Sequence, residues 1–219
     1  MDAAAQLARV ELFSALDAEG VAAVAAAARS CTFQRNDLVF SEGDQAEDLY
    51  VVRDGRIAIT IRSPDGRESV VALMEQDDLF GEMPFFDGEG RSADARALEP
   101  AELLAVLYQA LRDVLEERPK LLWKVTELMA RRLRATDAAL ADSMFLDVTG
   151  RTAKRLLELA GDADEFTLPV TQEELAGLVG ASRERVNKAL ASFIRLGWIE
   201  QRDRKYHIAD RQQLTRRAR

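Results

Sequence analysis

The sequence predicts an α+β protein, with an N-terminal antiparallel β-roll, then a long helix, then a C-terminal winged helix-turn-helix. Three observations predict this fold. Short β-branched stretches alternate with turn signals from about residue 31 to 107. A stretch without Gly or Pro, typical of a single helix, follows Pro119. Two short capped helices joined by a glycine-containing turn lie near the C-terminus. The predicted segments are 1–118, 119–146 and 147–219.

The composition allows a folded core but provides few of the residue types that catalytic and metal sites use. The 219 residues are 47% hydrophobic and 31% charged, which excludes wholesale disorder and fits two modest domains. One cysteine, Cys31, and one histidine, His207, cannot build a disulfide, a zinc site, an iron–sulfur cluster or a histidine-based triad. No Walker or Rossmann glycine pattern is present. We therefore expect that the protein is not an enzyme and that it holds no metal, haem or iron–sulfur cluster. The rival interpretations are an enzyme that uses carboxylates and a redox or haem sensor.

Charge and hydropathy bear on partners and location. The formal charge is −8, but residues 1–150 hold 16 Lys and Arg against 28 Asp and Glu, whereas residues 151–219 hold 14 against 10. A basic C-terminal segment behind an acidic body suits contact with a phosphate backbone, although chance variation between solvated surfaces is the alternative. No apolar run approaches the roughly 20 residues of a membrane span, and no signal pattern opens the chain. We expect a cytoplasmic protein without a membrane partner.

The roll is predicted from the order of its short strands. Residues 3–29 are alanine-rich with helical apolar spacing and predict short helices ahead of it. Strands this short and this regularly interrupted favour an antiparallel roll over βαβ units. The expected strands are 38–40, 49–52, 57–61, 70–73 and 103–107, and the turns are 42–44, 54–55, 64–66, 77–78 and 87–88.

A long helix is predicted to follow the roll. A short helix over 108–117 precedes it, and Pro119 suits the first turn of a helix that reaches about Met144. Its apolar stripe is close to a heptad and either packs on the roll or forms a dimer seam. We favour a dimer because a helix of about 25 residues projects beyond a small roll. A hinge is expected at 147–150 and a further helix at 151–160. The stripe is Val125, Met129, Leu133, Thr136, Leu140 and Ser143.

The C-terminal segment carries a helix-turn-helix signature. Thr171 and Glu174 form a capping box for a helix that ends at Gly180. Ser182 caps a second helix over 183–196, and the stretches 198–200 and 206–208 flank a turn at 203–205 as a β-hairpin wing. This order of cap, turn, cap and wing favours a DNA-binding module over an ordinary helical hairpin with a solvated charged face.

The start of the second helix would read DNA. Arg183 and Lys188 can donate to guanine, and Glu184 can accept from cytosine N4. Thr171, Ser182 and Arg185 are better placed for phosphates. Double-stranded DNA is therefore the expected partner.

Several segments resemble known families. The stretches 80–83 (FGEM) and 90–93 (GRSA) resemble the phosphate-binding cassette of cyclic-nucleotide-binding domains. The stretches 129–133 (MARRL), 145–151 (FLDVTGR) and 179–184 (VGASRE) are similar to the catabolite activator (CRP/FNR) family, and the similarity covers essentially the whole chain. It implies a homodimeric, cAMP-responsive transcription regulator that binds a pseudo-palindromic operator with half-sites like TGTGA. It also implies RNA polymerase as a partner, near 161–167.

The chemistry of the cassette agrees with this resemblance. Arg91 offers a fork of donors to a phosphodiester, Ser92 adds a hydroxyl, and amides from Gly81 to Met83 can line an anion-binding concavity. The resemblance gives Glu82 to the ribose 2′-OH, and we expect Glu82 to pair with Arg91 as well. A structural ion pair in a vestigial pocket is the alternative, and it corresponds to a regulator that acts without ligand or with another effector.

Two residues, Asp137 and Lys188, depart from the pattern of the enteric family members. The resemblance puts Thr136 and Asp137 at the purine, one from each subunit, and Asp137 replaces an expected serine. A carboxylate can only accept, which suits the amino group of adenine and repels the carbonyl of guanine, so we expect cAMP over cGMP. A solvated helix aspartate is the other interpretation. Lys188 stands where an arginine is usual, which predicts weaker discrimination at its guanine.

Overall fold

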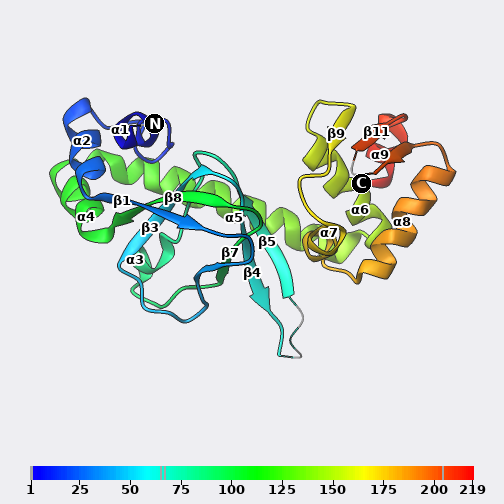
Figure 1. Cartoon of the computed structure of the whole chain (residues 1–219), viewed down its shortest axis with the longest axis horizontal. Coiled ribbons are helices and arrows are strands. Elements are labelled where there is room, and N and C mark those ends of the chain that lie inside the picture. Colours follow the sequence, from blue (N-terminus) through cyan, green and yellow to red (C-terminus); the bar gives the residue numbers. More distant parts are fainter. Residues whose placement is uncertain (1, 65, 67, 204) are drawn as a thin grey trace. The chain divides into compact units, whose positions relative to one another are not determined.

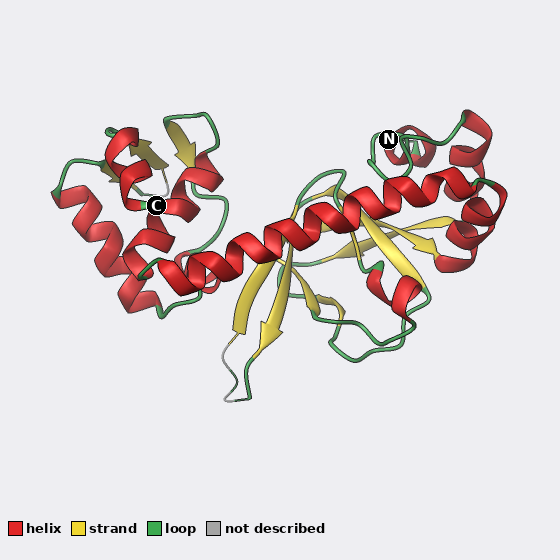
Figure 2. Cartoon of the chain, turned by 180° about the vertical axis from the view of Figure 1, so that it is seen from behind, coloured by secondary structure: helices red, strands yellow, loops and turns green. Residues whose placement is uncertain are grey.

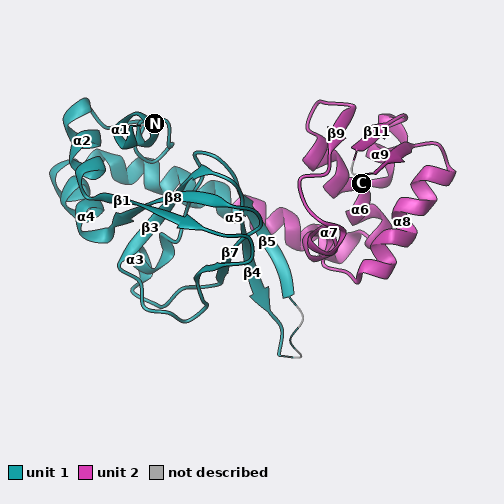
Figure 3. Ribbon diagram, viewed as in Figure 1, with its two compact units in different colours: residues 1–133 teal, residues 134–219 magenta. Residues whose placement is uncertain are grey.

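The computed structural model describes residues 2–64, 66, 68–203 and 205–219 and divides the chain into two compact units, Met1–Leu133 and Arg134–Arg219 (Figure 3). Two predicted features, the turn at Asp65 and the wing tip at Arg204, therefore lie partly outside the described residues. In the described ranges, no helix combines the length and hydropathy needed to cross a bilayer.

The N-terminal unit contains two four-stranded antiparallel sheets (Figure 1). This arrangement confirms the predicted antiparallel roll. Three strands, β1, β6 and β7, were not expected, because polar and small residues dominate β1 and β7 and because β6 has only two residues. One sheet has the order β1 (Ala28–Phe33), β8 (Ala101–Leu107), β3 (Asp48–Asp54), β6 (Leu79–Phe80), and the other β2 (Leu38–Phe40), β7 (Asp94–Ala97), β4 (Ile57–Arg62), β5 (Glu68–Met74).

Strand β3 shows why this unit holds two hydrophobic clusters. Side chains alternate across a strand, and both faces of β3 are buried. Tyr50 and Val52 face a cluster within the roll, whereas Leu49 and Val51 join a second cluster built with the helices. The helices of this unit are α1 (Ala3–Leu7), α2 (Ala18–Ala26), α3 (Met83–Asp87) and α4 (Tyr108–Glu117).

The long helix is confirmed as α5 (Leu122–Phe145) (Figure 2). A 3-10 turn, η1 (Pro119–Leu121), precedes it. Two of the six residues predicted for the dimer seam of α5 pack within the N-terminal unit instead. Val125 is 6% exposed and Met129 packs against the same helical cluster, so the first turns of α5 cover the core of the N-terminal unit. Three later apolar residues are exposed and lie on one face at spacings of 7 and 4, typical of a coiled-coil seam, and Asp137 lies on the same face. That face holds Leu133, Asp137, Leu140 and Met144.

The C-terminal unit contains the predicted helix-turn-helix and wing. Helix α6 begins at Val148, three residues before the expected start, because the Asp147 carboxylate accepts a hydrogen bond from the Gly150 amide at 2.8 Å and caps the helix. The third strand β9 and the helix α9 were not expected. The elements are α6 (Val148–Ala160), β9 (Glu165–Thr167), α7 (Gln172–Val179), α8 (Arg183–Arg195), β10 (Ile199–Arg202), β11 (Lys205–Ile208) and α9 (Arg211–Arg217), with the sheet order β10-β11-β9.

Candidate functional site

The cassette between β6 and β7 is held by close backbone approaches. Gly81 has a φ of 76°, and a Cβ at this residue would lie 2.6 Å from Nη1 of Arg91, so the position requires glycine. The loop that carries Arg91 is tied to the β2–β3 loop, because the Gly43 amide donates to the Arg91 carbonyl at 2.8 Å and the Arg91 amide donates to the Asp44 carbonyl at 2.9 Å. The arginine is thus presented from a fixed backbone.

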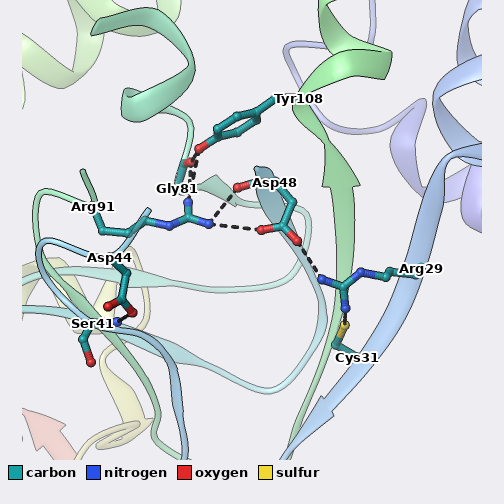
Figure 4. A network of polar contacts seen from close by, with 8 residues as sticks. All are labelled: Arg29, Cys31, Ser41, Asp44, Asp48, Gly81, Arg91 and Tyr108. Atoms are coloured by element: carbon teal, nitrogen blue, oxygen red, sulfur yellow. Dashed lines mark hydrogen bonds and ion pairs between the residues drawn. The ribbon is translucent and has the colours of Figure 1, made fainter. Parts of the chain in front are cut away.

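Arg91 is only 4% exposed, and both of its terminal nitrogens donate to acceptors of the protein (Figure 4). Its Nη1 donates to the Gly81 carbonyl at 2.7 Å and to the Tyr108 hydroxyl at 3.3 Å. Its Nη2 donates to the Asp48 carbonyl at 2.8 Å and to Oδ1 of the same residue at 3.1 Å. The other carboxylate oxygen, Oδ2, accepts from Arg29 at 2.7 Å. A buried cation with a carboxylate counter-ion results.

Aromatic side chains surround this guanidinium. Its central carbon lies 4.1 Å from the Phe40 ring centroid and 5.5 Å from that of Tyr50. Burial is the main cause that raises the pKa of Tyr108 to about 12. Burial, followed by the Asp48 carboxylate, raises the pKa of Tyr50 to about 12. Both phenols therefore stay protonated at physiological pH and add no competing negative charge.

Glu82, 1% exposed, occupies the N-cap position of α3. The expected Glu82–Arg91 ion pair is wrong: Glu82 instead pairs with Arg132 of α5, which also donates to the Leu79 carbonyl. The reason is that both terminal nitrogens of Arg91 are directed at other acceptors. Arg132 was missed, although it lies in the MARRL stretch, because the sequence does not show which of two adjacent arginines turns inward. Arg131 instead pairs with Glu127 at 3.0 Å.

Two buried polar atoms of the cassette have no hydrogen-bond partner among the described residues. They are Nε of Arg91, a donor, and Oε2 of Glu82, an acceptor. Buried polar atoms are nearly always paired, so such atoms indicate capacity to bind a ligand. Ser92 and Met83 are exposed next to this pair, with Oγ of Ser92 3.4 Å from Sδ of Met83. The structure therefore brings Gly81, Glu82, Met83, Arg91 and Ser92 together.

The expected purine contacts lie on α5. Thr136 and Asp137 are both exposed and belong to the unit Arg134–Arg219. Asp137 shares the exposed face with Leu133 and Leu140, which are 63% and 59% exposed. Asp137 thus lies on the apolar face suited to a second helix, and Thr136 is its neighbour in sequence.

The capping box predicted for α7 is confirmed. The Glu174 amide donates to the Thr171 hydroxyl at 3.2 Å, and the Thr171 amide donates to the Glu174 carboxylate at 2.6 Å. Gly180 adopts a φ of 65° and ends the helix. Ser182 then caps α8 and accepts a hydrogen bond from the Arg185 amide at 3.4 Å. These local bonds fix the turn between the two helices.

The charged start of α8 is solvent-exposed. Glu184 and Lys188 form an ion pair at 2.9 Å, and each side chain is 76% exposed. The hydrogen bond from Lys188, followed by its charge, lowers the pKa of Glu184. Arg183 lines a hollow of about 350 Å³ together with Thr171 at the start of α7 and Gln201 of the wing. The predicted base-reading and phosphate-contacting residues are thus accessible around one end of α8.

Comparison with known proteins identifies a domain family in each part of the chain. The family described as "Cyclic nucleotide-binding domain" matches residues 30–118, and the "Crp-like helix-turn-helix domain" matches residues 150–217. The CRP-like cAMP-activated global transcriptional regulator of Mycobacterium tuberculosis (strain ATCC 25618 / H37Rv) is 40% identical over 220 residues, 97% of this chain and 98% of that protein. The cAMP-activated global transcriptional regulator CRP of Escherichia coli O157:H7 is 36% identical over 156 residues, 68% of this chain and 74% of that protein.

A solved structure extends the comparison. The c-di-GMP responsive global regulator CLP of Xanthomonas campestris matches with a TM-score of 0.76 at 26% identity, over 88% of this chain and 99% of that one. The fold, the matched domains and the relatives define a transcription regulator, not an enzyme, in which a cyclic-nucleotide-binding domain precedes a helix-turn-helix domain. The chain belongs to the CRP/FNR family. The predicted fold class and family resemblance are confirmed.

Proposed function

We propose that the effector of this regulator is cAMP, bound in the cassette. The observation that carries the proposal is the pair of buried, unpartnered atoms, Nε of Arg91 and Oε2 of Glu82, within the described residues. A cyclic nucleotide offers one phosphodiester anion and one ribose 2′-OH, which match a cationic donor and an acceptor. Ser92 supplies a hydroxyl for the anion, and Gly81 and Met83 supply backbone around it. The residues present therefore fit the ligand.

Adenine is the base that Asp137 favours. Its carboxylate accepts hydrogen bonds but donates none, so it attracts the adenine amino group and repels the guanine carbonyl. Thr136, beside it on α5, supplies a hydroxyl that both donates and accepts. The names of the relatives from Mycobacterium tuberculosis and Escherichia coli, both cAMP-activated, support the same base.

The protein is proposed to act as a homodimer through α5. Leu133, Leu140 and Met144 are more than half exposed and lie on one face, which an equivalent helix of a second chain would cover. Asp137 lies on this face, so in the dimer a purine that touches Thr136 of one chain meets Asp137 of the other. Binding would then bias how the paired helices pack, and the bias would pass to the hinge at Asp147.

The DNA-binding unit reads the operator with α8. Arg183 and Lys188 donate to guanine and Glu184 accepts from cytosine, while Thr171, Ser182 and Arg185 hold phosphates. The Glu184–Lys188 ion pair is exposed, so little energy is needed to exchange it for base contacts. A dimer of such units suits a pseudo-palindromic site, and affinity falls as salt rises because bound counterions are released.

Contact with RNA polymerase is proposed for the loop after α6. Arg211 of α9 donates to the Gly161 carbonyl at 2.8 Å and pairs with Asp164 at 3.1 Å. These bonds hold the loop in one shape, which suits it to recognition by another protein.

Calorimetry with cAMP, cGMP and cyclic di-GMP tests the proposed effector. We expect reversible binding of one cAMP per chain and at least tenfold weaker binding of cGMP. Tighter binding of cyclic di-GMP would show a different effector, and absence of heat with all three nucleotides would indicate a regulator that acts without a nucleotide.

A further inference from the structure

We propose that Asp48 is a built-in competitor of the effector, which sets nucleotide affinity by occupying part of the Arg91 fork. The proposal rests on the function proposed above, in which Arg91 holds the phosphodiester. Figure 4 shows the contacts that carry it: a chain of polar contacts runs from Gly81 and Tyr108 through Arg91 and Asp48 to Arg29.

A count of the donors on Arg91 leads to this role. A guanidinium has five N–H groups. Four of them belong to Nη1 and Nη2, whose partners are the Gly81 carbonyl, the Tyr108 hydroxyl, the Asp48 carbonyl and the Asp48 carboxylate. The fifth, on Nε, has no partner in the described part of the chain. Nε alone is therefore open to an anion.

A phosphate that accepts two parallel hydrogen bonds from a guanidinium needs a second N–H group next to the one on Nε. Nη2 is the terminal nitrogen on the same side as the Nε hydrogen, and Nη2 is the nitrogen that Asp48 occupies. The Asp48 carbonyl belongs to β3 and is fixed by the sheet. The side-chain contact is longer, 3.1 Å against 2.8 Å, and a side chain can turn away, so the phosphate displaces the carboxylate.

The charges of Asp48 and Arg29 act on the entering phosphate with opposite signs. Asp48 is 8% exposed, so its negative charge is weakly screened at the place where a second negative charge must enter. Arg29 reaches Asp48 from β1, across β8, and holds Oδ2 at 2.7 Å. Arg29 thereby shares the carboxylate with Arg91 and gives it another partner when a phosphate arrives. Asp48 opposes anion binding, and Arg29 favours it.

This arrangement predicts effects of opposite sign. Asp48→Asn keeps an oxygen acceptor for Nη2 and removes the charge, so cAMP affinity rises about tenfold. Arg29→Gln leaves the carboxylate to Arg91 alone, so affinity falls about three- to tenfold. In an Asp48→Asn background, Arg29→Gln changes affinity less than twofold. Glu99→Gln is the matched control, because it removes the same charge from another ion pair of the roll, with Arg56 at 2.8 Å, and leaves affinity within twofold.

The experiment is a calorimetric titration of the full-length variants with cAMP and, by competition, with its uncharged methyl phosphotriester. Thermal unfolding without nucleotide first establishes that each variant folds. Tighter cAMP binding by Asp48→Asn with unchanged phosphotriester affinity supports the proposal. Equal or weaker cAMP binding by a folded Asp48→Asn overturns it and makes Asp48 only an anchor for Arg91. If wild-type protein fails to bind cAMP, the proposed effector is wrong, and the series is repeated with the nucleotide that binds.

Discussion

Replacing Arg91 with leucine is the most informative change to the cassette. Leucine removes the charge and all five N–H donors. A charge-assisted hydrogen bond contributes about 1.5–3 kcal/mol, and a phosphate held through Nε and Nη2 receives two of them. The expected loss is therefore about 3–6 kcal/mol, or roughly 10²- to 10⁴-fold in affinity for cAMP. Isothermal titration calorimetry measures this loss directly.

The same substitution also affects folding, and this effect must be measured separately. Arg91→Leu removes four hydrogen bonds to the protein, but Asp48 keeps Arg29 as its partner. We expect a loss of about 2–3 kcal/mol in the free energy of unfolding, seen as a lower Tm. Arg91→Lys keeps the charge without the fork and should bind cAMP with intermediate affinity. A folded Arg91→Leu variant whose Kd for cAMP lies within fivefold of wild type would refute the assigned role.

Three further predictions concern the helix α5 and the DNA-binding unit. Asp137→Ala should reduce the preference for cAMP over cGMP about tenfold in competition binding; an unchanged ratio would show that this carboxylate does not face the base. Leu140→Glu should place like charges on the exposed face of α5 and shift the protein to monomers in sedimentation velocity, whereas a dimer of wild-type stability would exclude that face as the seam. Lys188→Arg should sharpen discrimination at one guanine about tenfold in competition with single-base operator variants, because arginine makes the bidentate contact. Equal selectivity would count against this contact.

Features that depend on residues close in sequence were predictable. The capping box of Thr171 and Glu174, the cap at Ser182 and the turn at Gly180 depend on residues three or fewer positions apart, and the structure has each of them. The strand β2 and the helix α4 were also found with the correct limits; the turn residues Glu42, Gly43 and Asp44 follow β2, and Pro119 follows α4.

Features that depend on distant partners were not predictable. Arg91 meets Asp48 across 43 residues, and Glu82 meets Arg132 across 50, and no local pattern selects these partners over the expected Glu82–Arg91 pair. Two residues of the stripe predicted on α5, Val125 and Met129, were wrongly assigned to the seam for a similar reason. Val125 is as apolar as any heptad position, and only the packed helical cluster shows that it faces its own unit.

A cyclic nucleotide held at Arg91 is proposed to control the binding of DNA by α8. Fluorescence anisotropy of a labelled palindromic operator, titrated with full-length protein at fixed salt with and without saturating cAMP, tests it most directly. We predict at least tenfold tighter operator binding with cAMP in the wild-type protein and no change in the Arg91→Leu variant. Equal operator affinity with and without cAMP in the wild-type protein would show that the nucleotide does not control DNA binding.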